Sequence, residues 1–580
     1  MFSLKMSSRF PQQILMIAGM VLFIGTSNAA SGANENLARP NVILILSDDQ
    51  GYGDIGFHGN PKIKTPHLDR MAKEGIELSR FYCSPVCAPT RASLMTGRYY
   101  YRTGVIHTSR GGAKMHGDEV TIAELLKEAG YKTGIFGKWH LGDNYPMRPE
   151  DQGFEETLVH KSGGIGQSPD QPNSYFDPWL WKNGKKRKTV GYCTDVFFKA
   201  ALDFIDQHKT GEQPFFVYLP VNAPHTPLEV DQTYWKPYQK AGLNETTARV
   251  YGMVSNLDEN IGKLMAFLKK SELMDSTIVV FVGDNGPQQK RFTAGLRGRK
   301  SWTYEGGIRV PFLAHWQGQF QKGVKSDQIA AHIDIMPTLL SLTKTPRPEN
   351  LILDGIDLSD LLSGKDAKLP SRSLFFQVHR GLTPKRYQNS AVVTQKFKLV
   401  SYPGTFGNEN LMLNAEPLLE LYDLSVDPEE KHNLITSQPE TVESLRRQYE
   451  AWFTIMKQSR HFEPGIIVVD QKKESPCVLC RYQDGNYFQG VSQGWMVRVS
   501  NSGLYEIQIE RGQKKTAGKI VVNWLGQQAH EYLNAGQSSA EFELRAGTGL
   551  LDIWFQADGQ DRIHITNNGT LGDVTLKQLK

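Results

Sequence analysis

Two apolar runs that lie far apart in the sequence are each followed at once by oxygen-bearing side chains: Asp48 and Asp49 in one case, Asp284 and Asn285 in the other. Adjacent carboxylates repel each other and are costly at a buried strand end unless a cation lies between them. Carboxylate and amide oxygens suit Ca²⁺ or Mg²⁺. Each pair alone could be a polar turn. Together they predict one metal site, provided that both runs are strands of the same sheet.

The elements that must position these side chains have the composition of buried strands. The apolar runs are Asn41–Leu46, Phe215–Leu219 and Thr277–Val282. Continuous runs of this kind, rich in β-branched residues, are typical of parallel strands covered on both faces. Helical patterns at residues 121–130 and about 248–273 lie between them, and strands alternating with helices predict an α/β fold. In such folds ligands bind at the carboxyl ends of the strands.

The N-terminus has the pattern of an export signal over residues 1–29. Lys5 and Arg9 precede the short apolar stretch Ile14–Ile24, and small residues at 27–29 suit cleavage. The stretch is short for a membrane span, although an uncleaved anchor is the alternative. We therefore expect an exported protein, periplasmic or secreted, with no stable membrane insertion after signal cleavage.

The composition is that of an ordinary globular protein. Of the 580 residues, 39% are hydrophobic and 22% are charged, which excludes a mainly disordered chain. The formal charge is only +5, and no basic stripe indicates a nucleic-acid partner. The basic run at 185–188 is interpreted as a solvated hairpin tip, with a collar for an anionic substrate as the alternative.

The chain divides into three predicted parts after the signal. Residues 38–369 form an α/β domain, residues 370–460 form a small antiparallel-sheet subdomain, and residues 465–580 form a β-sandwich. The tryptophans of the last part could stack on sugar rings, as in carbohydrate-binding modules, or fill the sandwich core: Trp495, Trp524 and Trp554. In an exported protein Cys477 and Cys480 could form a disulfide, or remain thiols in the linker before the sandwich.

The most specific segment surrounds Cys87. Cys87-Ala88-Pro89-Thr90-Arg91 resembles the sulfatase signature Cys-x-Pro-x-Arg, although Ser is common at position 90 of the pattern. Further family-like motifs follow in order at residues 130–142, 222–227, 296–311 and 421–434, with Arg299 where Gly is frequent. Over residues 38–460 the chain resembles a type I sulfatase of the alkaline-phosphatase-like superfamily, and within it arylsulfatases and N-acetylgalactosamine-sulfatases.

The resemblance implies a specific chemistry. A formylglycine-generating maturation enzyme would oxidise Cys87 to Cα-formylglycine, whose hydrate is the nucleophile. One Ca²⁺ would be held by Asp48, Asp49, Asp284, Asn285 and the modified Cys87. Arg91 and Lys138 would polarise the nucleophile, and His140 would take a proton when the sulfated hydrate collapses. His225 and Lys300 would bind sulfate, and one of them would protonate the leaving oxygen.

Two other functions are alternatives to sulfate-ester hydrolysis. A phosphomonoester or phosphodiester hydrolase on the same scaffold would commonly need two transition metals, with more ligands than the sequence offers. A non-catalytic binding protein would be expected to lose some of the implied residues, and all are present. The predicted substrate is a sulfated small molecule or glycan, most consistent with a sulfated carbohydrate.

Overall fold

The three predicted buried strands form the centre of a ten-stranded sheet in a computed structural model of the protein. The structure describes residues 39–579 except 168, 171–172, 366, 380–382, 403–416, 482–484, 486, 489–490, 493, 512–515 and 560–570. The predicted signal peptide at residues 1–29 lies outside this range.

The central strands run parallel, as their composition predicts. β1 (Asn41–Ser47) lies between β8 (Phe215–Pro220) and β9 (Thr277–Gly283), and both pairings are parallel. The full sheet has the order β12-β2-β11-β9-β1-β8-β4-β5-β6-β7. The remaining strands are β2 (Ile76–Leu78), β4 (Lys132–Lys138), β5 (Glu156–His160), β6 (Trp179–Lys182), β7 (Lys185–Lys188), β11 (Phe312–His315) and β12 (Val324–Ser326).

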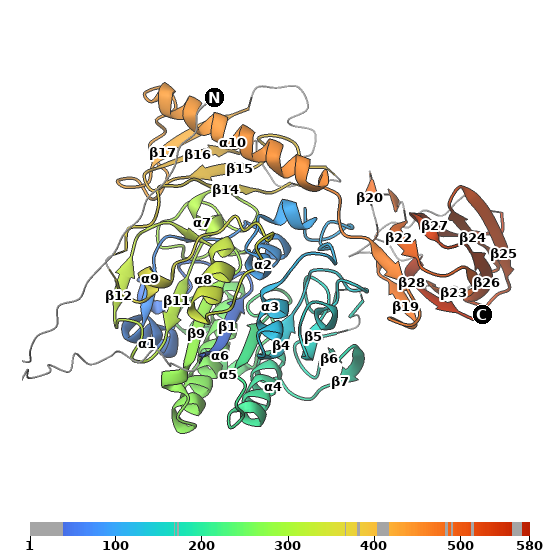
Figure 1. The fold of residues 1–580 in the computed structure, drawn as a ribbon, viewed down its shortest axis with the longest axis horizontal. Helices are drawn as coiled ribbons and strands as arrows, with labels where there is room; N and C mark the ends of the chain where they lie inside the picture. Colours follow the sequence, from blue (N-terminus) through green and yellow to red (C-terminus); the bar gives the residue numbers. More distant parts are fainter. Residues whose placement is uncertain are drawn as a thin grey trace, which may run out of the picture. The chain divides into compact units, whose positions relative to one another are not determined.

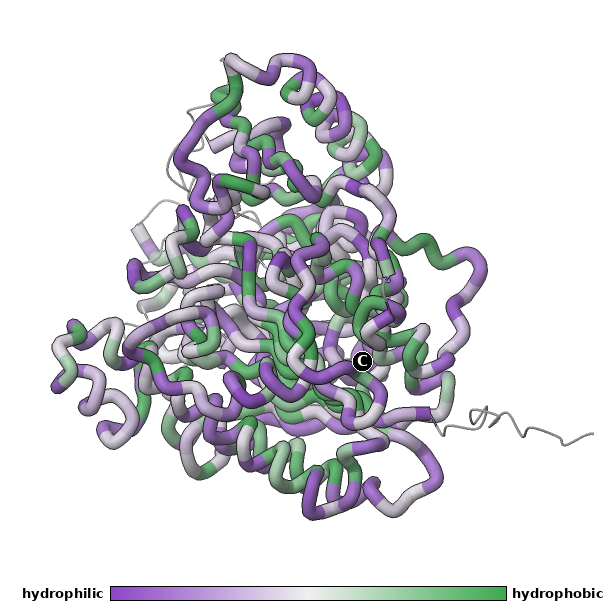
Figure 2. The backbone as a smooth tube through the Cα atoms, turned by 90° about the vertical axis from the view of Figure 1, so that its left-hand side faces the viewer, coloured by the Kyte–Doolittle hydropathy of each residue, from purple (hydrophilic) through white to green (hydrophobic). Residues whose placement is uncertain are grey.

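Helices cover both faces of this sheet (Figure 1). Along β1, Val42, Leu44 and Leu46 pack into one hydrophobic cluster, whereas Ile43 and Ile45 pack into another. This alternation explains why the strand is apolar throughout. The first cluster includes α2 (Cys87–Thr96), α3 (Ile122–Glu128) and α8 (Ile335–Leu342); the second includes α1 (Pro66–Glu74), α4 (Cys193–His208), α5 (Gln232–Lys240) and α6 (Glu245–Lys270). Figure 2 shows the hydrophobic stretches gathered at the central strands.

Both predicted helices are present. The pattern at 121–130 is α3, which begins after Thr121 with a capping box to Glu124, and the pattern at 248–273 lies largely within α6. Short elements complete this part: β3 (Phe81–Tyr82), β10 (Arg309–Val310), β13 (Ala330–Ala331), α7 (Glu305–Ile308) and α9 (Ser359–Leu362). The basic run forms β7, which pairs antiparallel with β6 as a hairpin and whose residues are all exposed.

A four-stranded antiparallel sheet follows, as predicted. Its order is β14-β15-β16-β17, and the helix α10 (Pro439–Arg460) comes after it. A buried ion cluster joins this sheet to the larger part, because Lys398 Nζ lies 3.0 Å from Glu305 Oε1 and 2.9 Å from Glu430 Oε1. The strands are β14 (Leu374–Gln377), β15 (Ser390–Val393), β16 (Phe397–Ser401) and β17 (Leu419–Asp423).

The C-terminal segment folds into two sheets around one hydrophobic cluster. One sheet has the order β18-β22-β27-β24-β25 and the other has the order β19-β28-β23-β26. The strands are β18 (Ile467–Val469), β19 (Cys477–Leu479), β22 (Trp495–Val499), β23 (Gly503–Arg511), β24 (Gly518–Trp524), β25 (Gln527–Leu533), β26 (Ser539–Leu544), β27 (Gly547–Ala557) and β28 (Leu571–Gln578), with a separate pair β20 (Tyr487–Phe488) and β21 (Val491–Ser492).

Two expectations for this segment are settled. Trp495 and Trp524 belong to the hydrophobic cluster of the sandwich, and Trp554 is buried as well, so none of the three offers an exposed platform for sugar rings. Cys477 and Cys480 are buried thiols, so the predicted disulfide is wrong. The alternative placed both residues in the linker before the sandwich. That position is wrong for Cys477, which opens β19 and so belongs to a strand that pairs with β28 inside the sandwich. Among the described residues, no helix has the length and hydropathy of a membrane span.

Candidate active site

The carboxyl ends of β1 and β9 bring the predicted metal ligands together. Ser47 is in register with Gly283, so Asp48 and Asp284 leave the sheet side by side. The Asp49 N–H donates to Asp284 Oδ1 at 3.1 Å. Asp49 adopts a left-handed φ of 64°, which is uncommon for a residue with a side chain and is concentrated at functional sites.

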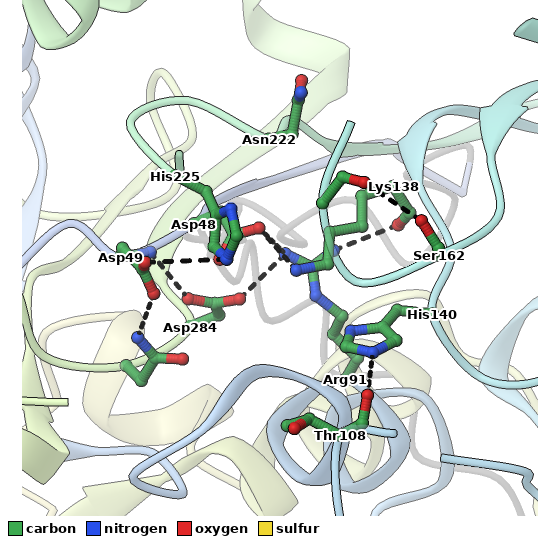
Figure 3. Close-up of polar contacts among 12 residues, drawn as sticks. Asp48, Asp49, Arg91, Thr108, Lys138, His140, Ser162, Asn222, His225 and Asp284 are labelled. Carbon is green, nitrogen blue, oxygen red and sulfur yellow. Dashed lines mark hydrogen bonds and ion pairs between the residues drawn. The ribbon is translucent and has the colours of Figure 1, made fainter. Parts of the chain in front are cut away.

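Two buried cations lie against these carboxylates (Figure 3). Lys138, the last residue of β4, places Nζ 2.6 Å from Asp48 Oδ2, and Arg91 Nη2 lies 2.8 Å from Asp284 Oδ2. Burial alone would raise the pKa of Asp48, but the neighbouring cations, Lys138 first, outweigh it and lower that pKa. Burial and the charge of Asp48 raise the pKa of Asp284. A bound cation would favour the ionised form of both.

Three oxygens in this cluster are buried and have no hydrogen-bond partner: Asp48 Oδ1, Asp49 Oδ2 and Asn285 Oδ1. Buried polar atoms are rarely left unpaired in folded proteins. A hard cation is the ligand that would satisfy all three. The residues present therefore fit a Ca²⁺ or Mg²⁺ site.

Cys87 opens helix α2 beside the same carboxylates. Its Sγ and oxygens of Asp48 and Asp284 lie within 4.8 Å of one another. The Thr90 hydroxyl donates to the Asp284 carbonyl at 2.7 Å, which ties the first turn of α2 to the end of β9, so Thr serves here as a hydroxyl donor. Burial raises the pKa of the Cys87 thiol, which disfavours an ordinary thiolate nucleophile.

The two predicted histidines have defined protonation patterns. His140 Nε2 lies 2.8 Å from the Thr108 carbonyl; because a carbonyl only accepts, Nε2 carries the proton. His140 Nδ1 is buried without a hydrogen-bond partner, and burial lowers the pKa of the ring, which leaves Nδ1 as a neutral base. His225 Nδ1 donates to Thr226 O at 2.7 Å, and its Nε2 faces Asp49 Oδ2 at 3.9 Å.

Lys300 completes the cluster from a distant loop. Its Nζ lies 2.6 Å from Asp49 Oδ1, and Asn285 Nδ2 donates to the same oxygen at 2.8 Å. Burial would lower the pKa of Lys300, but the charge of Asp49 outweighs it and raises that pKa, so the ammonium stays protonated. Every predicted site residue is thus brought to one place.

A cavity of about 510 Å³ opens over this cluster. Its wall includes a segment that the sequence analysis missed, because Gly163 and Gly164 lie against the rings of His140 and His225. A methyl group at Gly164 would come within 2.9 Å of His225 Cε1. In the sequence this segment is marked only by the Gly163-Gly164 pair, shortly after β5. The lining residues are Val86, Cys87, Thr108, Ser109, His140, Gly163, Gln167, His225, Thr226, Gln288, Arg299, Lys300, Ser301 and Trp302.

Comparisons with known proteins agree with this geometry. The sulfatase family model matches residues 40–345, and the model for the C-terminal region of N-sulphoglucosamine sulphohydrolase matches residues 298–455. Human arylsulfatase A is 33% identical, over 72% of this chain and 89% of that protein. Canine N-acetylgalactosamine-6-sulfatase is 32% identical, over 63% of this chain and 73% of that protein.

A solved structure extends the likeness to the fold. The crystal structure of Ps i-CgsB in complex with k-i-k-neocarrahexaose has a TM-score of 0.63 and 31% identity, and covers 71% of this chain and 92% of that one. With the strand-end carboxylates, the Cys87 segment and the ordered motifs on one site, the chain belongs to the sulfatase family of sulfuric ester hydrolases.

Proposed function

We propose that the protein hydrolyses sulfate monoesters on carbohydrates, with a Cα-formylglycine made from Cys87 and one bound Ca²⁺. The observation that carries the proposal is the position of Cys87, at the start of α2 and beside the unpartnered oxygens of the strand ends. The names of the similar proteins support a carbohydrate substrate, since they include an N-acetylgalactosamine-6-sulfatase and a complex with a neocarrahexaose.

The cation would be held by Asp48, Asp49, Asp284, Asn285 and the modified Cys87. When bound, it would supply positive charge that polarises oxygens at the reacting centre. A formylglycine hydrate would supply a hydroxyl nucleophile, with a second hydroxyl through which sulfate can be released without attack of water on sulfur.

The other residues position groups and move protons. Arg91 is held by Asp284 and by the Lys138 carbonyl, which Nη1 contacts at 3.0 Å, so the guanidinium stays fixed beside the nucleophile. Neutral His140 accepts a proton at Nδ1. Lys300 and His225 hold the sulfate group, and one of them protonates the leaving oxygen.

A single metal centre is favoured over the pair that a phosphatase would use. The residue groups with metal-ligating spacing are Asp48–Asp49–His225 and Asp48–Cys87–Asp284 in the described part of the chain. Both contain Asp48, so they describe one centre. Phosphate-ester hydrolysis is therefore the less favoured alternative.

The route to the mature protein is also part of the proposal. Residues 1–29 would direct export to the periplasm or outside the cell, and a formylglycine-generating enzyme would modify Cys87 before folding. The division into an α/β domain at residues 38–369, a subdomain at 370–460 and a β-sandwich at 465–580 remains a prediction.

Mass spectrometry and turnover assays test the proposal together. Trypsin should release Phe81–Arg91, which contains both Cys83 and Cys87. In active protein the peptide should take up alkylating reagent at Cys83 alone and carry an aldehyde at position 87. Cys87→Ala is the control and should show no multiple turnover of an aryl sulfate. Two alkylated thiols in fully active enzyme, or faster hydrolysis of the matching aryl phosphate, would overturn the proposal.

A further inference from the structure

The turn formed by residues 299–302 belongs to the rim of the cavity and is anchored on both sides. The Lys300 N–H donates to the Pro287 carbonyl at 3.0 Å, and the Ser301 N–H donates to the Pro85 carbonyl at 2.7 Å. These partners lie just after the metal-binding segment and just before Cys87. The turn therefore holds its side chains in a defined position relative to the reacting centre.

Side chains of this turn point to different depths of the cavity. Lys300 reaches the floor, where it contacts Asp49, whereas Arg299 is exposed and Trp302 is half-buried. Both rim residues line the cavity. The Arg299 guanidinium carbon lies 5.9 Å from the centre of the Trp302 ring, and Tyr402 supports that ring at 4.8 Å between centroids.

Arg299 differs from the other arginines of its loop. Arg291 lies 2.7 Å from a carboxylate oxygen of Asp54, and Arg297 lies 3.3 Å from one of Glu420. Among the residues that the structure describes, no carboxylate oxygen lies within 4.0 Å of the Arg299 guanidinium. The described lining of the cavity also contains no Asp or Glu. An anion that enters the cavity would meet this guanidinium without competition from a described acidic side chain.

The remaining rim is polar and neutral. Gln167, Gln288, Thr108 and Ser109 contribute amide and hydroxyl groups, which suit sugar hydroxyls. A volume of about 510 Å³ falls within the range of ligand pockets, so the cavity has room beyond the sulfate at its floor. An indole supported from behind suits the apolar face of a sugar ring.

We propose that Arg299 and Trp302 form a second subsite, which binds a further anionic group of the substrate outside the reacting sulfate. Trp302 stacks on the sugar ring and Arg299 pairs with a carboxylate or second sulfate on that ring or its neighbour. The preferred substrate is then an acidic glycan with more than one negative charge. This inference rests on the proposed function, and it adds the substrate class.

Competition against aryl sulfate turnover tests the subsite without knowledge of the natural glycan. The competitors are three tetrasaccharides. The hyaluronan probe carries carboxylates only, the κ-carrageenan probe carries sulfates only, and the agarose probe carries no charge. Both anionic probes should inhibit wild-type enzyme, and the agarose probe should inhibit more weakly. Arg299→Gln should raise the inhibition constants of the anionic probes by about three- to tenfold, the range expected for one accessible charge pair. Trp302→Leu should weaken all three.

Arg187→Gln is the matched control, because Arg187 is an exposed arginine on β7; its inhibition constants should equal those of wild type. The ratio between the hyaluronan and carrageenan effects in Arg299→Gln identifies carboxylate or sulfate as the preferred anion. Wild-type enzyme that no anionic probe inhibits, or equal inhibition constants in Arg299→Gln and wild type, would overturn the subsite while leaving sulfatase activity in place. Absence of aryl sulfate turnover in formylglycine-bearing wild type would instead overturn the proposed function.

Discussion

The backbone of Gly163 lies directly against the imidazole ring of His140. A methyl group at Gly163 would come within 2.8 Å of His140 Cε1 and 2.9 Å of Nε2. Contacts this short require the ring to shift. His140 Nε2 already donates to the Thr108 carbonyl. A shift of the ring would therefore disturb the hydrogen bond that keeps the proton on Nε2 and leaves Nδ1 as the base.

Gly163→Ala should therefore reduce kcat on an aryl sulfate by about tenfold or more, since displacement of a catalytic group by about 1 Å can cost that much. The melting temperature should change little by comparison. Gly211→Ala is the control, because its nearest contact would be an ordinary 3.4 Å. Wild-type kcat in Gly163→Ala would refute the role assigned to this contact.

Removal of the metal should lower stability as well as activity. The unpartnered oxygens of Asp48, Asp49 and Asn285 gain a partner only when a cation binds. Ca²⁺ at about a hundred times its Kd should restore about 2.7 kcal/mol to the free energy of unfolding of chelator-treated protein. Thermal melts with added Ca²⁺ measure this gain independently of turnover.

Asn285→Ala should weaken that Ca²⁺-dependent rise in melting temperature, whereas Asn183→Ala, on the β6–β7 turn, should not. Restoration by Zn²⁺ alone, with two zinc ions per chain, would instead favour the phosphatase alternative.

The buried His332 should make stability depend on pH. Its Nε2 lies 3.0 Å from Ser84 Oγ, and burial lowers its pKa from 6.5 to about 3. Below pH 6.5 His332 is protonated in the unfolded chain, whereas in the folded chain it stays neutral until about pH 3. Stability should therefore fall through this window as pH falls, by up to about 1.4 kcal/mol per pH unit from this group.

His332→Gln removes this titrating group and should reduce the slope of stability against pH between pH 6 and 4, to which other buried histidines such as His140 still contribute. Urea unfolding of both proteins at matched pH values measures the difference. Parallel stability curves for the two proteins would contradict the assignment.

Glu474 joins the C-terminal sandwich to the segment after His140. Its Oε2 accepts hydrogen bonds from the Tyr145 N–H at 3.0 Å and from Asn144 Nδ2 at 3.3 Å. Glu474→Ala should cost about 1–2 kcal/mol of stability, because it leaves buried or half-buried donors without a charged acceptor. Denaturant unfolding should show the loss.

Glu531→Ala, on the exposed strand β25, is the control for Glu474→Ala. Equal unfolding midpoints for the two variants would show that the contact contributes nothing measurable.

The sequence by itself determined the elements and the residue types of the site. Continuous apolar runs predict buried strands because a strand covered on both faces must be apolar at every position, and β1, β8 and β9 follow that rule. The residues after β1 and β9 could be placed together from the sequence, since parallel strands end at the same edge of a sheet. The family resemblance then supplied Cys87, His140, His225 and Lys300.

Only the tertiary structure decided what surrounds these residues. No local pattern shows that Gly163 faces His140, that Ser301 is tied to Pro85, or that Arg299 has no described carboxylate beside it. The alternation in the C-terminal strands predicted a sandwich, but burial of Trp495 depends on which face the second sheet covers. Periodicity and motifs report interactions between near neighbours in the chain, whereas these contacts join segments that meet only when the sheets pack.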